Sequence, residues 1–391
     1  MLDFSFSQEQ DYFRAALKEF AKSELRPNYT KWDRERVLPR ELWKKLAELG
    51  VTGLRIPERY GGSEADCITA GIAAEEVARG DFNLTYSVML NSLISEIIGQ
   101  HASEKLKSEW LPPMAKGEKI VGIALTEPGA GTDAAGIKTT AAHKKDVYVL
   151  NGEKSGISVA TVADAFIVFA KTDHDRGSRG ISSFLIPADL HGIETIGYED
   201  MGNIPIGRGS IYFNDVEVPE DCLIGTENKG FLQVMNGFDL SRILIGLQCV
   251  GAALQSLDET IEYVKMRYSF GKPLAKYQGV SFPIVEHYTK LEMVKWLAYR
   301  GLWLRDQGQK HTKEAASVKW LGPKYSQAAI HDSLLLNGHY AYTKEMPHEQ
   351  RLRDVIGLEI GDGTAQVNQM VIATELFGKE FRPYEKTQKE H

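Results

Sequence analysis

The spacing of apolar residues changes twice along the chain. In residues 1–118 apolar residues recur every three or four positions, which predicts helices over SQEQDYFRAALKEFAKSEL, PRELWKKLAELG and TAGIAAEEVARG. Ser7 is the predicted N-cap of the first helix, and Gly50 is the glycine predicted to end the second. The stretch LPPMAKGEK then interrupts the pattern with two prolines and a glycine, so we place a domain boundary after residue 118.

Between residues 119 and 225 the pattern becomes that of short strands. The runs are rich in β-branched and aromatic residues and are bounded by turn residues: KIVGIAL, DVYVLNG, GISV, DAFIVFAK, ISSFLIPA and SIYFNDVEVP. Asn151-Gly152 predicts a hairpin turn after VYVL. This middle segment is therefore predicted to be a β domain.

Residues 226–391 return to helical spacing. One stripe of apolar positions, three or four residues apart, consists of Leu247, Val250, Leu254, Leu257, Ile261 and Val264. Such a stripe predicts core or a helix–helix interface. Arg267 continues it, where a guanidinium either snorkels to solvent or holds an anion, and SFGKPL is predicted to break the helix at Gly271 and Pro273. The chain is thus predicted to be α+β, with domains at 1–118, 119–225 and 226–391.

Composition narrows the possible partners. The 391 residues carry a net charge of −7, which gives no electrostatic reason to expect nucleic acid or an anionic membrane. We expect no signal peptide and no transmembrane span, because the start lacks a basic and apolar leader and no long apolar run occurs. Cys67, Cys222 and Cys249 are far apart and predict reduced thiols, hence a cytoplasmic location. The ten histidines show no metal-binding spacing, so no metal is expected.

Two glycine-rich segments could carry chemistry. ALTEPGAGTDAAG (124–136) contains GxGxxA, but a further strand follows instead of a helix, so we discount a dinucleotide fingerprint. It is either an ordinary loop or a loop whose N–H groups and hydroxyls bind a polar ring or phosphate. In GLEIGDGT, Asp362 lies between Gly361 and Gly363, as a solvated loop acid, a helix cap or a functional carboxylate on a flexible turn.

The order of these segments resembles the acyl-CoA dehydrogenase family over essentially the whole chain. TEPGAGTD, NGEKSGIS, DLSR, RYSFGKPLAKYQ, TKEMPHEQRLRD and GDGT follow one another in the family's running order. The resemblance implies a helical N-terminal domain, a middle β-barrel domain and a C-terminal four-helix bundle. It also implies FAD as cofactor, an acyl-CoA substrate, electron-transfer flavoprotein as electron acceptor, and a homotetramer built as a dimer of dimers.

The resemblance also implies roles for individual residues. Leu125 and Thr126 match residues that face the flavin, and Gly131 and Thr132 share their loop, with Thr132 near the pantetheine–phosphate region of the substrate. The remaining flavin positions match Ile157, Ser158, Arg267, Phe270, Gln278, Gly338 and Thr364, of which Arg267, Phe270 and Gln278 would serve a neighbouring subunit's FAD. The substrate positions match Asn91 for the acyl pocket, Asp239 and Arg242 for the CoA, and Gly363 for the thioester.

Asp362 falls on the family's catalytic base. The base removes a proton from Cα of the thioester while Cβ gives a hydride to flavin N5, and the backbone N–H at the base position polarises the thioester carbonyl. Most members have glutamate there, so the carboxylate of Asp362 is one methylene shorter. Gly156 and Val159 replace the usual tryptophan and asparagine beside the flavin. Ser241 occupies the position where some members carry the base instead, and serine cannot serve as that base.

The predicted function is α,β-dehydrogenation of an acyl-CoA, with a ring-bearing (cyclohexane-1-carboxyl type) or branched acyl group. A short- or medium-chain straight acyl group is the first alternative. The second is a nitroalkane-oxidase-like flavin oxidase, which also uses aspartate but has an arginine where this chain has Gln369. The third is a non-catalytic member, against which the retained TEPGAGTD and RYSFG segments argue.

Overall fold

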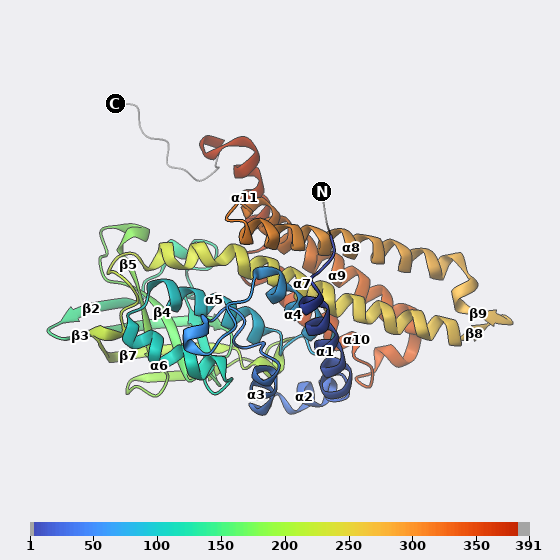
Figure 1. Cartoon of the computed structure of the whole chain (residues 1–391), viewed down its shortest axis with the longest axis horizontal. Helices are drawn as coiled ribbons and strands as arrows, with labels where there is room; N and C mark the ends of the chain where they lie inside the picture. Colours follow the sequence, from blue (N-terminus) through green and yellow to red (C-terminus); the bar gives the residue numbers. More distant parts are fainter. Residues whose placement is uncertain (1–3, 382–391) are drawn as a thin grey trace.

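In the computed structural model, which describes residues 4–381, helices at both ends of the chain flank a β-sheet (Figure 1). Within that range the N-terminal domain comprises α1 (Gln8–Phe20), α2 (Tyr29–Glu35), α3 (Glu41–Glu48), α4 (Cys67–Gly80), α5 (Tyr86–His101) and α6 (Glu104–Ala115). Ser7 caps α1, because its Oγ accepts a hydrogen bond from Gln10 N and the Gln10 side chain accepts one from Ser7 N. Gly50 follows α3 at φ +79°, as predicted.

The double proline does not stop α6 where the pattern suggested. α6 runs through Pro112 and Pro113 and ends at Ala115. The two carbonyls that the proline nitrogens cannot bond belong to Ser108 and Glu109, which are both exposed. Water can solvate these carbonyls, so the helix completes its last turn despite the prolines.

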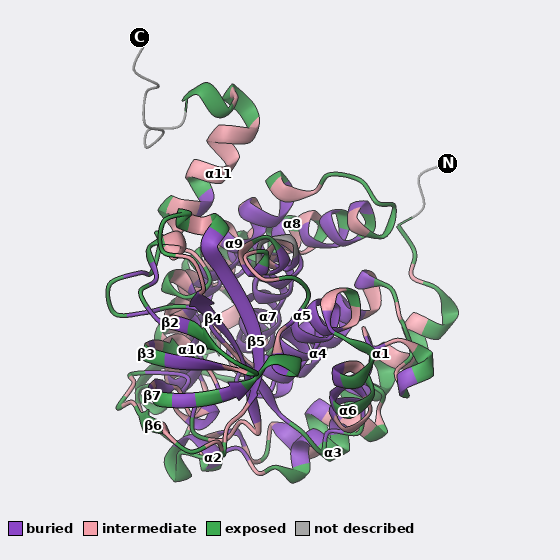
Figure 2. Cartoon of the chain, turned by 90° about the vertical axis from the view of Figure 1, so that its left-hand side faces the viewer, coloured by how far each residue is buried: buried purple, intermediate pink, exposed green. Residues whose placement is uncertain are grey.

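The middle domain is a curled sheet. Its strands in the described chain are β1 (Val121–Ala124), β2 (Thr140–Lys144), β3 (Val147–Ile157), β4 (Ala165–Lys171), β5 (Ile181–Pro187), β6 (Ile193–Gly197) and β7 (Gly209–Pro219). The order is β1-β4-β2-β3-β7-β6, and β5 pairs with β4. Every residue of β4 is buried, which agrees with the six apolar residues before Lys171 in its sequence AFIVFAK and with its pairing to β1, β2 and β5. In Figure 2 the residues of β5 are coloured as buried, whereas β2, β3 and β7 also carry exposed residues.

The hairpin predicted at Asn151-Gly152 is wrong. β3 continues through both residues, and its pairing with β7 shifts register beside Gly152, which marks a β-bulge. Gly152 lies at φ +146°, and a Cβ there would come within 2.6 Å of Thr139 Oγ1. The hairpin turn joins β2 to β3 instead, where Lys145 has φ +55°. Bulges and tight turns both favour residues that tolerate positive φ, so the dipeptide alone did not distinguish them.

The C-terminal domain consists of long packed helices: α7 (Gly230–Met266), α8 (Gln278–Asp306), α9 (Thr312–Asn337), α10 (His348–Ile360) and α11 (Ala365–Phe377). The predicted apolar stripe is buried on α7, except that Ile261 is half-buried. α7 is long and apolar enough to cross a membrane by length and composition, but 94% of its most apolar window is buried inside the protein. It is therefore the core helix of this domain, and the predicted order of helices, strands and helices is confirmed.

α7 ends five residues before Gly271, where the break was predicted. Met266 is its last residue, and Arg267 already has the extended angles φ −80° and ψ 122°. A short hairpin follows, with β8 (Tyr268–Ser269) and β9 (Lys272–Pro273), so Gly271 turns the hairpin rather than ending the helix.

One buried carboxylate on α10 joins the three domains. Asp354 accepts hydrogen bonds from Tyr29 Oη (2.7 Å), Asn83 Nδ2 (3.1 Å) and Asn203 N (2.6 Å). Tyr29 and Asn83 lie in the N-terminal domain and Asn203 lies in the middle domain. The helix that leads into Asp362 is thereby fixed against both other domains.

Candidate functional site

The turn between α10 and α11 carries the predicted base. The chain leaves α10 at Gly361, whose N–H donates to Gly357 O (3.0 Å), and Asp362 and Gly363 then take positive φ angles of +53° and +93°. Thr364 caps α11, because its Oγ1 accepts a hydrogen bond from the N–H of the third helical residue. A non-glycine residue at positive φ costs about 1 kcal/mol, so the turn holds Asp362 in a strained conformation.

Asp362 lies in a cationic environment. It is accessible to solvent, yet protein packs closely around its carboxylate. Burial raises the pKa of Asp362 above its usual value, while the charges of Lys319 and Arg242 act in the opposite direction. A raised pKa is what a general base needs to hold the abstracted proton.

The predicted CoA-side residues lie together on α7. Arg242 Nη1 pairs with Asp239 Oδ1 at 2.9 Å, and Thr312 Oγ1 on α9 donates to Asp239 Oδ2 at 2.6 Å. The Nε of Arg242 is buried and has no hydrogen-bond partner among the described residues. Arg242 therefore retains an N–H that a bound ligand could use, and its positive charge favours the ionised form of Asp362.

The predicted flavin-facing residues are also brought together. Ser155 N donates to Thr126 O at 2.9 Å, which places the strand end at Leu125 and Thr126 beside the end of β3. Ile157 is buried there and Ser158 is half-buried. The loop that follows carries Gly131 and Thr132, both exposed, and a Cβ built at Gly131 would meet nothing within 4 Å. The segment 126–136 holds a short 3-10 turn (Ala134–Gly136) and no α-helix, so the dinucleotide fingerprint was rightly discounted.

The space beside Gly156, where most family members would carry a tryptophan, is almost free of other protein atoms. It has φ +67°, and a Cβ there would find only Arg208 Nη2 within 4 Å, at 3.6 Å. Arg208 pairs with Asp200 at 2.9 Å, and Gly156 N donates to Tyr198 Oη at 3.1 Å. Arg208 therefore borders the space that an indole would occupy.

The predicted diphosphate and adenine contacts lie elsewhere. Arg267, Phe270 and Gln278 are exposed and surround the β8–β9 hairpin, at the opposite end of the molecule from the β-sheet (Figure 1). Phe270 is 95% exposed. One chain cannot bring these residues to its own flavin-facing strands. They could meet the flavin only of a second copy, which is the arrangement that the resemblance implies.

Two further predicted residues have a local structural role. Asn91 on α5 is buried, and its Nδ2 donates to Thr52 O at 3.2 Å. Gly338 ends α9 at φ +71°, where a Cβ would meet nothing within 4 Å. Asn91 is thus a buried helix residue bonded to a backbone carbonyl, and its role in an acyl pocket stays a prediction; the backbone conformation is the reason for Gly338.

The sequence interpretation missed two residues near the base. Lys319 is buried on α9, and its position on the stripe of Ala315, Val318 and Gly322 was the available signal. Tyr86 begins α5 and is 5% exposed. Burial raises the pKa of Tyr86. The positive charge of Arg208 lowers that pKa, and the negative charge of Asp362 raises it. No local pattern marked Tyr86.

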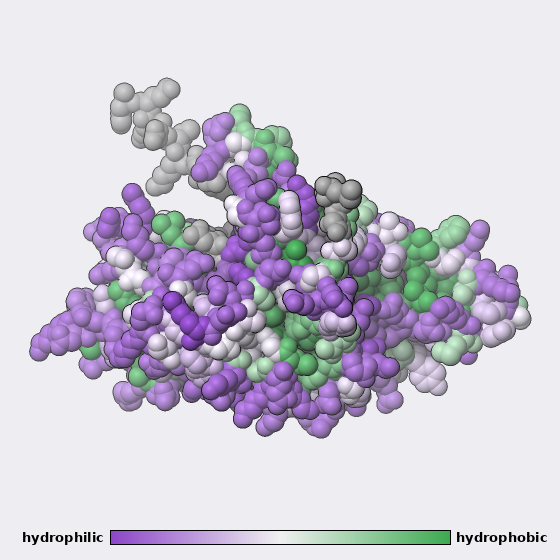
Figure 3. All heavy atoms as spheres, viewed as in Figure 1, coloured by the Kyte–Doolittle hydropathy of each residue, from purple (hydrophilic) through white to green (hydrophobic). Residues whose placement is uncertain are grey.

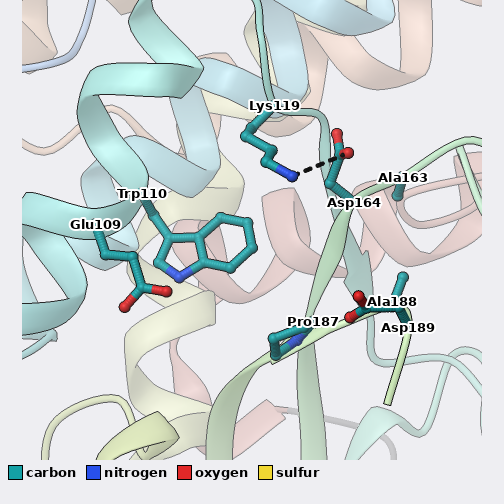
Figure 4. Close-up of a pocket in the computed structure, with 8 residues that line it drawn as sticks. All are labelled: Glu109, Trp110, Lys119, Ala163, Asp164, Pro187, Ala188 and Asp189. Atoms are coloured by element: carbon teal, nitrogen blue, oxygen red, sulfur yellow. Dashed lines mark hydrogen bonds and ion pairs between the residues drawn. The ribbon is translucent and has the colours of Figure 1, made fainter. Parts of the chain in front are cut away.

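Clefts at the surface of the described chain include two of note. One of about 420 Å³ borders the base turn between α9, α10 and α11 and is lined in part by Lys319, Glu359 and Gln369. The other, of about 550 Å³, lies between α6 and the ends of β4 and β5, where Trp110 faces Lys119 and Asp164 (Figure 4). No predicted site residue lines this second cleft, which is therefore separate from the candidate active site.

Models of three domains match the chain in order: the acyl-CoA dehydrogenase N-terminal domain (residues 7–118), middle domain (122–216) and C-terminal domain (228–377). The caffeyl-CoA reductase-Etf complex subunit CarC of Acetobacterium woodii is 36% identical over 377 residues, which cover 96% of this chain and 100% of that one. The structure of butyryl-CoA dehydrogenase from Megasphaera elsdenii matches with a TM-score of 0.92 and 32% identity, covering 96% and 100%. The structure of PigA with FAD and proline matches with a TM-score of 0.92 and 29% identity, covering 96% and 99%.

Proposed function

The chain belongs to the acyl-CoA dehydrogenase family, and from this premise we propose that it oxidises the Cα–Cβ bond of an acyl-CoA with Asp362 as the base. One observation carries the assignment of the base: Asp362 lies exposed on a strained turn between two glycines, at the position that the resemblance identified, and the raised pKa of its carboxylate agrees with that role. Catalytic carboxylates are commonly tuned in this way by burial.

The turn offers both groups that the proton transfer needs. The carboxylate of Asp362 takes the Cα proton, and the backbone N–H of Asp362 donates to the thioester carbonyl as negative charge develops on it. Gly363 has no side chain to obstruct the thioester. Because the Asp362 carboxylate is one methylene shorter than that of glutamate, the substrate must approach the backbone closely.

FAD is the cofactor of this chemistry, and the residues present fit it. When bound, FAD accepts the hydride that leaves Cβ. Thr126 is exposed and Ser158 half-buried beside the buried side chains of Leu125 and Ile157, and the backbone around Gly131 is unobstructed. Structures of family relatives contain FAD.

The acyl group is proposed to be bulky at or near Cα, either ring-bearing or branched. The shorter base and the open space at Gly156 both support a substrate wider than a straight chain. A straight short chain remains the alternative, since a related structure is that of a butyryl-CoA dehydrogenase. Among a panel of CoA thioesters, equal turnover of butyryl-, octanoyl- and cyclohexanecarboxyl-CoA would contradict the proposal.

We propose electron-transfer flavoprotein as the redox partner, since a relative is a subunit of a reductase-Etf complex. We also propose a homo-oligomer. Exposed apolar and aromatic side chains gather around the β8–β9 hairpin, on the end of α7 and the start of α8 (Figure 3). They include Met266, Tyr268, Phe270, Phe282, Val285 and Met293. Such a patch would be costly to leave in water, and the FAD contacts that the resemblance implies for the hairpin would need a second copy.

A second candidate is the reverse reaction, reduction of an enoyl-CoA. The reductase name of the Acetobacterium relative favours it. The two directions share every residue described above, because the group that removes the Cα proton also returns it. Turnover of an enoyl-CoA with a reduced electron donor, compared with turnover of the saturated thioester, decides between them.

The test is an anaerobic titration. Purified protein loaded with FAD is mixed with cyclohexanecarboxyl-CoA and with straight-chain acyl-CoAs, and the flavin absorbance is followed in wild type and in Asp362→Ala. Bleaching in wild type alone supports Asp362 as the base. Equal bleaching in the variant would make Asp362 a structural residue and would require another base.

A further inference from the structure

A buried lysine lies directly behind the base turn. Lys319 on α9 is 2% exposed, and its Nζ donates hydrogen bonds to Leu358 O (2.6 Å) and Gly363 O (3.2 Å). Leu358 lies in the last turn of α10, where carbonyls lack helical partners because the chain leaves the helix at Gly361. One ammonium group therefore holds both the end of α10 and the far side of the turn.

A neutral side chain holds the same turn from α11. Asn368 is fully buried, and its Nδ2 donates to Gly363 O (2.9 Å) and Thr364 O (3.0 Å). Asp362 lies between these two anchors at positive φ. Since that conformation is unfavourable for aspartate, the carbonyl contacts on both sides account for its persistence.

We propose that Lys319 is a positioning residue for proton abstraction, fixing the base turn through two carbonyls and placing a positive charge beside Asp362. This inference rests on the proposed function. Among hydrogen bonds of the described residues, the ammonium reaches the carbonyls and not the carboxylate, so Asp362 stays available to substrate. A lysine buried with carbonyl acceptors alone would be costly, and a neighbouring carboxylate offsets that cost.

The charges support this arrangement. Burial lowers the pKa of Lys319, and Asp362 opposes that effect; in turn Lys319 opposes the rise that burial causes in the pKa of Asp362. The other titratable groups that face this pair are Arg242 and Cys249 on α7, Glu359 on α10 and Tyr86 on α5. Removing the charge at residue 319 therefore makes Asp362 harder to ionise.

A purely structural lysine is the competing explanation, and the chain offers a matched control. Lys171 on β4 is 8% exposed, and its Nζ donates to Gly177 O at 2.7 Å. Lys171→Met, like Lys319→Met, removes a buried ammonium from a carbonyl, but far from the base turn. Effects common to both variants report stability, and effects confined to Lys319 report positioning.

The experiment uses the FAD-loaded oligomer and an acyl-CoA that reduces the wild type. The rate of anaerobic flavin reduction and the exchange of the substrate α-proton in D₂O are measured against pH for both variants and for Lys319→Gln. Lys319→Met is expected to slow both processes about 100-fold, the cost of a misplacement of roughly 1 Å. The acid limb of the pH–rate profile of Lys319→Met is expected to move to higher pH, because the cation that favours the ionised form of Asp362 is gone. Lys319→Gln keeps a donor without the charge, so it should show the same limb shift with a smaller loss of rate.

A folded, FAD-loaded Lys319→Met protein with the wild-type rate and acid limb would overturn the inference alone. A loss of rate equal in Lys319→Met and Lys171→Met, without a shift of the limb, would do the same. If Lys319→Met does not fold, Lys319→Gln carries the test with the same two outcomes. A wild type that no CoA thioester reduces would instead overturn the proposed function itself.

Discussion

Replacing Asp354 by asparagine tests how the base helix is fixed to the rest of the molecule. Asp354 is fully buried and accepts hydrogen bonds from one donor in each of Tyr29, Asn83 and Asn203. In Asp354→Asn one oxygen becomes an NH₂ group, so the donors on that side lose their acceptor. Leaving buried donors without their acceptor typically costs about 1–3 kcal/mol, and we expect about 3 kcal/mol at pH 5, where Asp354 is mostly protonated.

The cost should depend on pH. Burial raises the pKa of Asp354 to about 6 in the folded protein, against about 3.9 in an unfolded chain. A raised folded pKa means that the contribution of Asp354 to stability is fully present below pH 4 and declines as the pH rises through 6. Integrating that linkage between pH 5 and pH 8 gives a decline of about 1.4 kcal/mol, which the non-titrating asparagine does not share.

The assay is urea unfolding followed by circular dichroism, at pH 5 and pH 8, with protein and FAD concentrations held constant because cofactor and subunits both stabilise the fold. Tyr29→Phe is the control, since it removes a single donor and should cost about 1.5 kcal/mol. A cost of Asp354→Asn below that of Tyr29→Phe at pH 5, or a cost that increases towards pH 8, would refute this reasoning.

Three further predictions concern the base, an ion pair and the bulge. Asp362→Asn should lower the rate of flavin reduction by about 10²–10⁴-fold in stopped-flow measurements, the usual contribution of a general base, without loss of bound FAD. Although burial alone would raise the pKa of Glu259, its pairing with Arg351 lowers that pKa to about 2. The stability of the wild type should therefore fall as the pH drops from about 4.3 towards 2. In thermal melts, Glu259→Gln should cost roughly 3 kcal/mol at pH 7, and its stability should fall less steeply towards low pH. Gly152→Ala should cost about 2 kcal/mol in denaturant unfolding because its Cβ meets Thr139, whereas Gly177→Ala, at φ +56° in open space, should cost only about 1 kcal/mol; equal costs would show that the contact is unimportant.

The sequence alone determined the features that depend on neighbours along the chain. The helical and alternating spacings predicted the α–β–α order, Ser7 and the glycine after α3 marked helix ends, and the stripe on α7 identified a buried face. Each of these signals lies within a few residues of the structure it predicts, because caps and periodic faces are local. The running order of the motifs then pointed to the family and to Asp362.

The tertiary structure decided what depends on residues far apart in sequence. Whether Asn151-Gly152 forms a turn or a bulge depends on the partner strand β7, which no local pattern specifies. Lys319 holds carbonyls 39 and 44 residues further along, and Asp354 collects donors up to 325 residues away. Their roles arise only when packing excludes water, because a buried polar group must then find partners within the protein, wherever in the chain they lie.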